Sequence, residues 1–142
     1  MRLKDKVAIV TGSGRGLGKG IAMKLAEEGA KVVVADMAPA DDTVAEIVAK
    51  GGTASAFAVN VSKQEEVHAL VKYAIDTYGT LDIMVNNAGI NRDGMLHKMP
   101  VENWQMVIDV DLTGVFFGTQ EALKHMRAQG SGRIINISSG SW

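Results

Sequence analysis

A glycine-rich turn near the N-terminus is the part of this sequence with the clearest chemistry. It reads Thr11-Gly12-Ser13-Gly14-Arg15-Gly16-Leu17-Gly18 and directly follows a short apolar run. Glycines between a strand and a helix let backbone N–H groups approach a pyrophosphate, and the helix N-terminus adds partial positive charge. The spacing fits T-G-x-x-x-G-x-G, but not G-x-G-x-x-G or a P-loop, because Leu17 and Gly20 stand where those motifs need glycine and Ser or Thr. The turn predicts a dinucleotide site; the alternative is a glycine turn that binds no ligand.

An aspartate at the end of the second apolar run would complete such a site. Asp36 lies where a carboxylate accepts hydrogen bonds from the adenosine ribose hydroxyls. A carboxylate there repels a 2′-phosphate, so Asp36 favours NAD over NADP. Arg15 has the opposite effect, because a guanidinium in the glycine turn pairs with a 2′-phosphate. We expect NAD to be the cofactor, with NADP as the open alternative. A solvated aspartate at a strand end is the alternative for Asp36.

The elements that would position these residues alternate along the chain. Short apolar runs separate stretches of helical period, and runs that are apolar at every position indicate strands buried on both faces of a parallel sheet. The expected strands are residues 7–10, 32–35, 56–59, 83–85 and 134–137, and the expected helices are 17–28, 41–50, 63–76 and 101–128. Strands joined by helices make right-handed crossovers with helices on both faces. The pattern predicts a doubly wound, Rossmann-type α/β domain over residues 1–142, truncated after its fifth strand, which would be left at a sheet edge.

Asn86-Asn87-Ala88-Gly89 follows the fourth expected strand, and at this point the chain resembles the short-chain dehydrogenase/reductase family. The segment from Gly89 to Asp93, G-I-N-R-D, is further similar to that of 3-oxoacyl-[acyl-carrier-protein] reductases. The resemblance covers about the first three-fifths of a typical member. It implies cofactor-binding roles for the following residues: Gly12, Ser13, Arg15, Gly16, Leu17 and Gly18 around the pyrophosphate, Asp36 at the ribose, Asn60 and Val61 beside the adenine, and Asn87, Ala88 and Gly89 along the cleft.

The same resemblance implies catalytic roles for two residues. Ser139, after the fifth strand, aligns with the serine that hydrogen-bonds the substrate carbonyl oxygen. Asp111, in D-L-T-G-V-F, stands where the family has an asparagine that bends its helix and holds a water. Aspartate has no side-chain N–H donor, so this relay is altered. The family's Y-x-x-x-K motif, which supplies the proton donor, does not occur in the 142 residues, and we expect this chain alone to be inactive.

Composition and charge exclude several other classes of protein. The chain has 15 basic and 16 acidic residues, a net charge of −1 and no cysteine. This balance does not suit a nucleic-acid partner, and no apolar run is long enough for a membrane span. The three histidines lack the spacing of metal ligands, so we expect no metal. The leading hypothesis is a cytoplasmic, homo-oligomeric NAD(P)-dependent oxidoreductase acting on a carbonyl or alcohol substrate, with a 3-oxoacyl thioester as the favoured substrate. The alternative is a non-catalytic dinucleotide-binding or assembly protein.

Overall fold

A computed structural model describes residues 2–89 and 98–137. Strands and helices alternate along them, as the sequence predicts. The elements are β1 (Val7–Thr11), α1 (Gly16–Glu27), β2 (Lys31–Asp36), α2 (Asp41–Ala49), β3 (Thr53–Ala58), α3 (Gln64–Tyr78), β4 (Ile83–Asn86), α4 (Val101–Val107), the π-helical segment η2 (Ile108–Thr113), α5 (Gly114–Gln129) and β5 (Arg133–Asn136).

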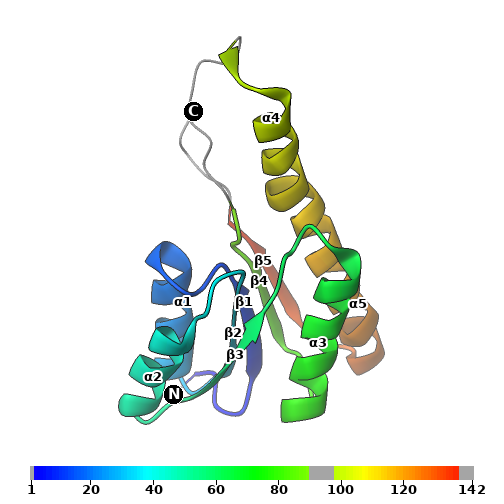
Figure 1. The fold of residues 1–142 in the computed structure, drawn as a ribbon. Coiled ribbons are helices and arrows are strands. Elements are labelled where there is room, and N and C mark those ends of the chain that lie inside the picture. The colour runs from blue at the N-terminus through cyan, green and yellow to red at the C-terminus, as the bar shows by residue number, and fades with distance from the viewer. Residues whose placement is uncertain (1, 90–97, 138–142) are drawn as a thin grey trace.

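The five strands form one parallel sheet in the order β3-β2-β1-β4-β5. The chain starts in the middle of the sheet, proceeds to one edge through β3, and returns to continue from β1 through β4 to the other edge. Helices α1 and α2 cover one face, and α3 and α5 cover the other (Figure 1). The structure is therefore a Rossmann-type doubly wound sheet, and β1 and β4 flank the point where the strand order reverses.

The core is split by the sheet into two apolar layers. Alternate strand residues point to opposite faces, so Ile9 packs toward α3 and α5 while Val10 packs toward α1 and α2. All five residues of β1 and all four of β4 are buried. For β1 and β4, this confirms the prediction that their apolar runs form strands buried on both faces.

The two edge strands differ from that prediction. The apolar run at residues 56–59 predicts a strand buried on both faces, but β3 spans 53–58 and its residues are half-buried or exposed. In β5, Ile135 is 44% exposed. An edge strand has a neighbour on one side only, so an apolar run does not by itself ensure burial. The predicted position of the fifth strand at an edge is correct for the sheet that the described residues form.

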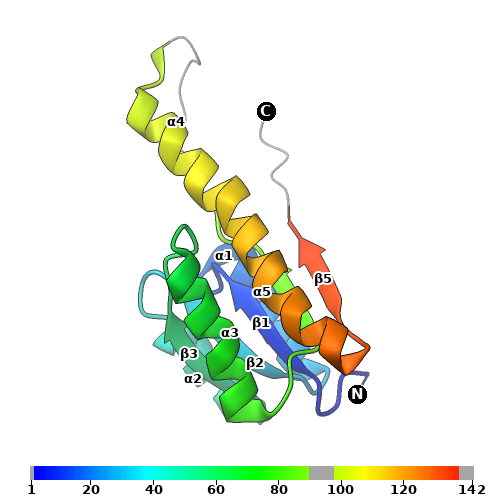
Figure 2. The same cartoon turned by 90° about the vertical axis from the view of Figure 1, so that its right-hand side faces the viewer.

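The longest expected helix, residues 101–128, contains a π-helical segment. α4 leads into η2, and η2 continues into α5 without a break in the coiled ribbon (Figure 2). A π-helical turn closes i→i+5 hydrogen bonds and is often found where a protein positions functional side chains. Asp111 lies in this segment. None of the helices within residues 2–89 and 98–137 has the length and hydropathy needed to cross a membrane.

Candidate dinucleotide site

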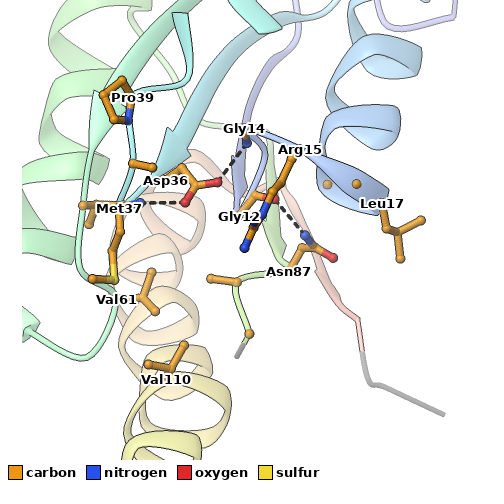
Figure 3. Close-up of a pocket in the computed structure, with 16 residues that line it drawn as sticks. Gly12, Gly14, Arg15, Leu17, Asp36, Met37, Pro39, Val61, Asn87 and Val110 are labelled. Atoms are coloured by element: carbon orange, nitrogen blue, oxygen red, sulfur yellow. Dashed lines mark hydrogen bonds between the residues drawn. The ribbon is translucent and has the colours of Figure 1, made fainter. Parts of the chain in front are cut away.

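A cleft of about 550 Å³ lies at the carboxyl ends of the strands, beside the turn after β1 (Figure 3). In doubly wound sheets, ligands bind at this edge, where the strand order reverses. The described residues that line it come from the glycine turn, the end of β2 and its loop, both sides of Asn60, the loop after β4, and η2. They are Gly12, Gly14, Arg15, Gly16, Leu17, Gly18, Asp36, Met37, Ala38, Pro39, Val59, Val61, Asn87, Ala88, Gly89 and Val110.

The glycines of the turn are required by backbone conformation and by space. Gly12 and Gly16 have φ of +64° and +60°, in the left-handed region that favours glycine. Apart from its chain neighbours and the backbone of α1, no described atom lies within 4 Å of a Cβ built on Gly16, so the backbone there faces open space in the cleft. A Cβ on Gly18 would overlap the Gly12 carbonyl and the Asn87 side-chain amide. The turn therefore presents bare backbone at the first turn of α1, where N–H groups have no partner within the helix.

Asp36 is held by backbone donors on both carboxylate oxygens. Its Oδ2 accepts a hydrogen bond from the Gly14 N–H at 2.9 Å, and its Oδ1 accepts one from the Met37 N–H at 2.7 Å. Each oxygen keeps a second lone pair, so the carboxylate still has capacity to accept hydrogen bonds from hydroxyls in the cleft. Arg15 follows Gly14 directly and lines the same cleft (Figure 3). The structure thus brings together the two residues with opposing preferences for a 2′-phosphate.

The loop after β4 is fastened to the glycine turn through Thr11. The buried Thr11 hydroxyl accepts hydrogen bonds from the N–H groups of Asn87 and Ala88, each at 3.0 Å. The Asn87 side chain donates a hydrogen bond to the Gly12 carbonyl at 3.2 Å. These bonds join the ends of β1 and β4, and they fix the floor of the cleft.

Two of the cofactor-binding residues expected from the resemblance do not line the cleft. Ser13 is fully buried; its hydroxyl lies 2.6 Å from the Val10 carbonyl and accepts a hydrogen bond from the Ala35 N–H at 3.0 Å. Ser13 therefore joins β1 to β2 beneath the site. The Asn60 side chain accepts hydrogen bonds from the Ser62 N–H and hydroxyl, which stabilise the turn before α3, while its neighbour Val61 lines the cleft. Ser139 lies outside the described residues.

The π-helical segment brings η2 to the cleft. Val110 lines the cleft, and a Cβ built on Gly89 would lie 3.3 Å from Asp111 Oδ1. A Cβ on Gly114 would lie 2.7 Å from Val61, so α5 begins in tight contact with the loop after β3. The sequence placed Asp111 near the site only through the resemblance, and the structure puts it against Gly89.

The structure adds several residues to the cleft that the sequence analysis does not assign to it. The sequence shows Gly14 only as part of the glycine turn, whereas in the structure its N–H donates a hydrogen bond to Asp36. Met37, Ala38 and Pro39 follow β2 directly, so their place at the carboxyl edge of the sheet was available as a signal. Val110 had no such signal, because its position depends on the π-helical segment.

Both tyrosines of the chain lie on α3, against β3. The Tyr78 and Ser55 hydroxyls are 2.9 Å apart, and the Tyr73 ring packs on Phe57 with ring centroids 5.1 Å apart. Neither is among the described residues that line the cleft. Tyr73 and Tyr78 therefore contribute to the packing of α3 on β3.

The fold and the cleft agree with a comparison against family models. Residues 6–141 match the model described as short chain dehydrogenase. The chain belongs to the short-chain dehydrogenase family. Members of this family are NAD(P)-dependent oxidoreductases, and the bare backbone of the glycine turn together with Asp36 fits such a dinucleotide.

Relatives within the short-chain dehydrogenase family carry different names. The chain is 50% identical over 140 residues to "3-oxoacyl-[acyl-carrier-protein] reductase" of Synechocystis, covering 96% of this chain and 57% of the relative. It is 46% identical to "Glucose 1-dehydrogenase 2" of Bacillus subtilis, covering 96% and 55%. A crystal structure of a short chain dehydrogenase from Mycobacterium avium superposes with a TM-score of 0.95 at 38% identity, covering 99% of this chain and 56% of that one. The chain therefore spans just over half the length of these relatives.

Proposed function

We propose that this chain is the cofactor-binding part of an oxidoreductase that prefers NAD to NADP. The observation that carries the proposal is Asp36, whose carboxylate is fixed at the end of β2 on the wall of the cleft. A 2′-phosphate beside this carboxylate would be repelled, whereas ribose hydroxyls would donate hydrogen bonds to it. Arg15 in the same cleft is the opposing influence; we give Asp36 more weight because two backbone N–H groups hold its carboxylate in place.

Each wall of the cleft has a separate task in this proposal. The first-turn N–H groups of α1, with Gly16 at the turn, would hold the pyrophosphate. Val61 and Val110 offer apolar contact for an aromatic base. A bound nicotinamide would supply or accept the hydride. Ser139 remains our proposed partner of the substrate carbonyl oxygen, and Asp111 stands at the catalytic position where the family has an asparagine, with an altered relay.

The substrate we propose is a carbonyl or alcohol compound, with a 3-oxoacyl thioester as the first to test. Support comes from the 3-oxoacyl-[acyl-carrier-protein] reductase named at 50% identity and from the G-I-N-R-D segment. The glucose dehydrogenase at 46% identity makes a sugar the necessary comparison substrate in any assay.

A dinucleotide-binding role without hydride transfer is the second candidate. It concerns the 142 residues by themselves, in which the residues four positions after Tyr73 and Tyr78 are Thr77 and Asp82 rather than lysine. General acid catalysis typically contributes about 10²–10⁴-fold to such a reaction. A polypeptide that lacks both the tyrosine and the lysine of the family's motif would therefore bind cofactor and turn over negligibly.

Calorimetric titration of the 142-residue polypeptide with NADH and with NADPH tests the cofactor proposal. NADH should bind more tightly than NADPH, and Asp36→Ala should reduce the difference between the two dissociation constants. Tighter binding of NADPH by the unmodified chain would mean that Arg15 dominates. A second assay measures NADH oxidation with acetoacetyl thioester and with glucono-lactone. Comparing this polypeptide with one that also supplies a Y-x-x-x-K segment distinguishes an oxidoreductase from a protein that only binds the dinucleotide.

A further inference from the structure

The carboxylate of Asp36 is connected to a buried hydroxyl on α2 through the glycine turn. The Thr43 Oγ1 donates toward the Ser13 carbonyl at 3.1 Å and lies 3.3 Å from the Gly14 carbonyl. The Gly14 N–H donates to Asp36 Oδ2 at 2.9 Å. Thr43 is fully buried, although the cleft itself is open. It is not among the described residues that line the cleft, so it would act on a ligand only through other residues.

The glycine at position 14 makes room for Asp36. Gly12 and Gly16 have positive φ, but Gly14 does not, so no left-handed backbone conformation requires glycine at position 14. A Cβ built on Gly14 would lie 2.9 Å from Asp36 Oδ2 and 3.6 Å from the Ala40 Cβ. The absence of a side chain at 14 therefore lets the carboxylate reach the Gly14 N–H. A larger residue would force the carboxylate to move.

We propose that Thr43 and Gly14 are positioning residues that set the cofactor preference by fixing the Asp36 carboxylate. Thr43 holds the Ser13–Gly14 peptide, and this peptide aims its N–H at Asp36. A carboxylate fixed in one rotamer keeps its negative charge at one place on the wall, where it opposes a 2′-phosphate. A carboxylate free to rotate would turn away from the phosphate and lose much of this discrimination. The inference rests on the proposed function, since it concerns the choice between NAD and NADP.

The test compares Thr43→Val with Thr43→Ser. Valine keeps the shape and removes the hydroxyl, whereas serine keeps the hydroxyl and removes a methyl group. We expect Thr43→Val to narrow the ratio of NADPH to NADH dissociation constants by about threefold to tenfold, the range that one hydrogen bond contributes to an equilibrium. Thr43→Ser should retain the ratio of the unmodified chain. An unchanged ratio in a folded Thr43→Val protein overturns the proposal, as does an equal narrowing in both variants.

Gly14→Ala decides the matter if Thr43→Val does not fold. With Thr43 intact, the methyl group added at position 14 should displace the Asp36 carboxylate and so narrow the ratio of the NADPH and NADH dissociation constants. Gly20→Ala is the matched control, since Gly20 lies in α1 outside the cleft lining and no described atom lies within 4 Å of its added Cβ. A ratio that Gly14→Ala leaves unchanged overturns the proposal.

A ligand-free measurement separates this inference from the proposed function. Amide hydrogen exchange at Gly14 should be faster in Thr43→Val than in the unmodified protein, and unchanged in Thr43→Ser. If the unmodified chain binds neither dinucleotide, the proposed function fails and the exchange result still tests the hydrogen-bond connection. If NADH binds more tightly than NADPH, but Thr43→Val changes neither the Gly14 amide exchange nor the ratio of the NADPH and NADH dissociation constants, the proposed function stands and this inference fails.

Discussion

The Asn87 side-chain amide donates a hydrogen bond to the Gly12 carbonyl at 3.2 Å, directly beneath Gly18. A Cβ on Gly18 would overlap both of these groups. The glycine turn after β1 and the Asn-Asn-Ala-Gly segment after β4 are 75 residues apart in the chain, and they form one packed unit. The two motifs thus depend on each other for their positions.

Replacing Gly18 should disrupt this unit. Gly18→Ala places a methyl group against backbone that cannot move aside, so we expect destabilisation by about 1–3 kcal/mol, as for other overpacked sites. Dinucleotide affinity should fall with it. Gly20→Ala is the control two positions along α1, with open space around its Cβ, and should be neutral or stabilising by up to about 1 kcal/mol. Urea denaturation of both variants makes the comparison, and equal stabilities would contradict the packing argument.

Thr11 should matter for stability through its hydroxyl. Thr11→Val removes the acceptor of the Asn87 and Ala88 N–H groups, and leaving these partly buried donors without a partner should cost about 1 kcal/mol or more. Thr11→Ser keeps the acceptor and loses one methyl group, which is worth about 0.8 kcal/mol when buried. Chemical denaturation should therefore rank serine above valine. The opposite order would show that the methyl contact, rather than the hydrogen bonds, holds the loop.

Glu121 should make the protein sensitive to acid. It is 2% exposed on α5; burial raises its pKa, but hydrogen bonds from Lys124 and His68 outweigh burial and lower the pKa below the usual 4.5. The unfolded chain then binds more protons than the folded one as the pH falls past 4.5, so the stability from Glu121 is present above that pH and lost below it. Denaturant titrations from about pH 6 to about pH 3 should show a steeper loss for the unmodified protein than for Glu121→Gln.

The matched control for Glu121 is the exposed ion pair of Lys72 and Asp76 on α3. Asp76→Asn should change the free energy of unfolding by less than about 1 kcal/mol at neutral pH. Glu121→Gln should cost about 1–3 kcal/mol there, because it weakens hydrogen bonds to a buried charged group. If the free energy of unfolding falls equally steeply with decreasing pH in the unmodified protein and in Glu121→Gln, Glu121 is not the source of the acid sensitivity.

Self-association should depend on the outer face of η2 and α5. Leu112, Phe116 and Leu123 are 63%, 57% and 41% exposed, and Trp104 on α4 is 49% exposed. Apolar side chains gathered on one exposed helix often form contacts between copies of a chain. We expect Phe116→Asp to shift sedimentation toward the monomer by about tenfold or more in dissociation constant. Val48→Asp, on α2 and 54% exposed, is the control and should have no effect. A dilute, long-lived monomer of the unmodified chain would exclude the idea.

The sequence by itself determined the alternation of strands and helices along the chain, the glycine turn after the first strand and the position of Asp36 at the end of the second strand. These follow from local signals, because short apolar runs indicate strands, and the glycines at positions 12 and 16 permit the positive φ that the turn adopts. Tertiary structure decided the rest. The burial of Ser13, the partial exposure of β3 and the hydrogen bond from Thr43 toward Gly14 depend on contacts between residues far apart in the chain. Likewise the π-helical turn that brings Val110 to the cleft occurs where the start of α5 packs tightly on Val61, and no spacing within residues 101–128 records that contact.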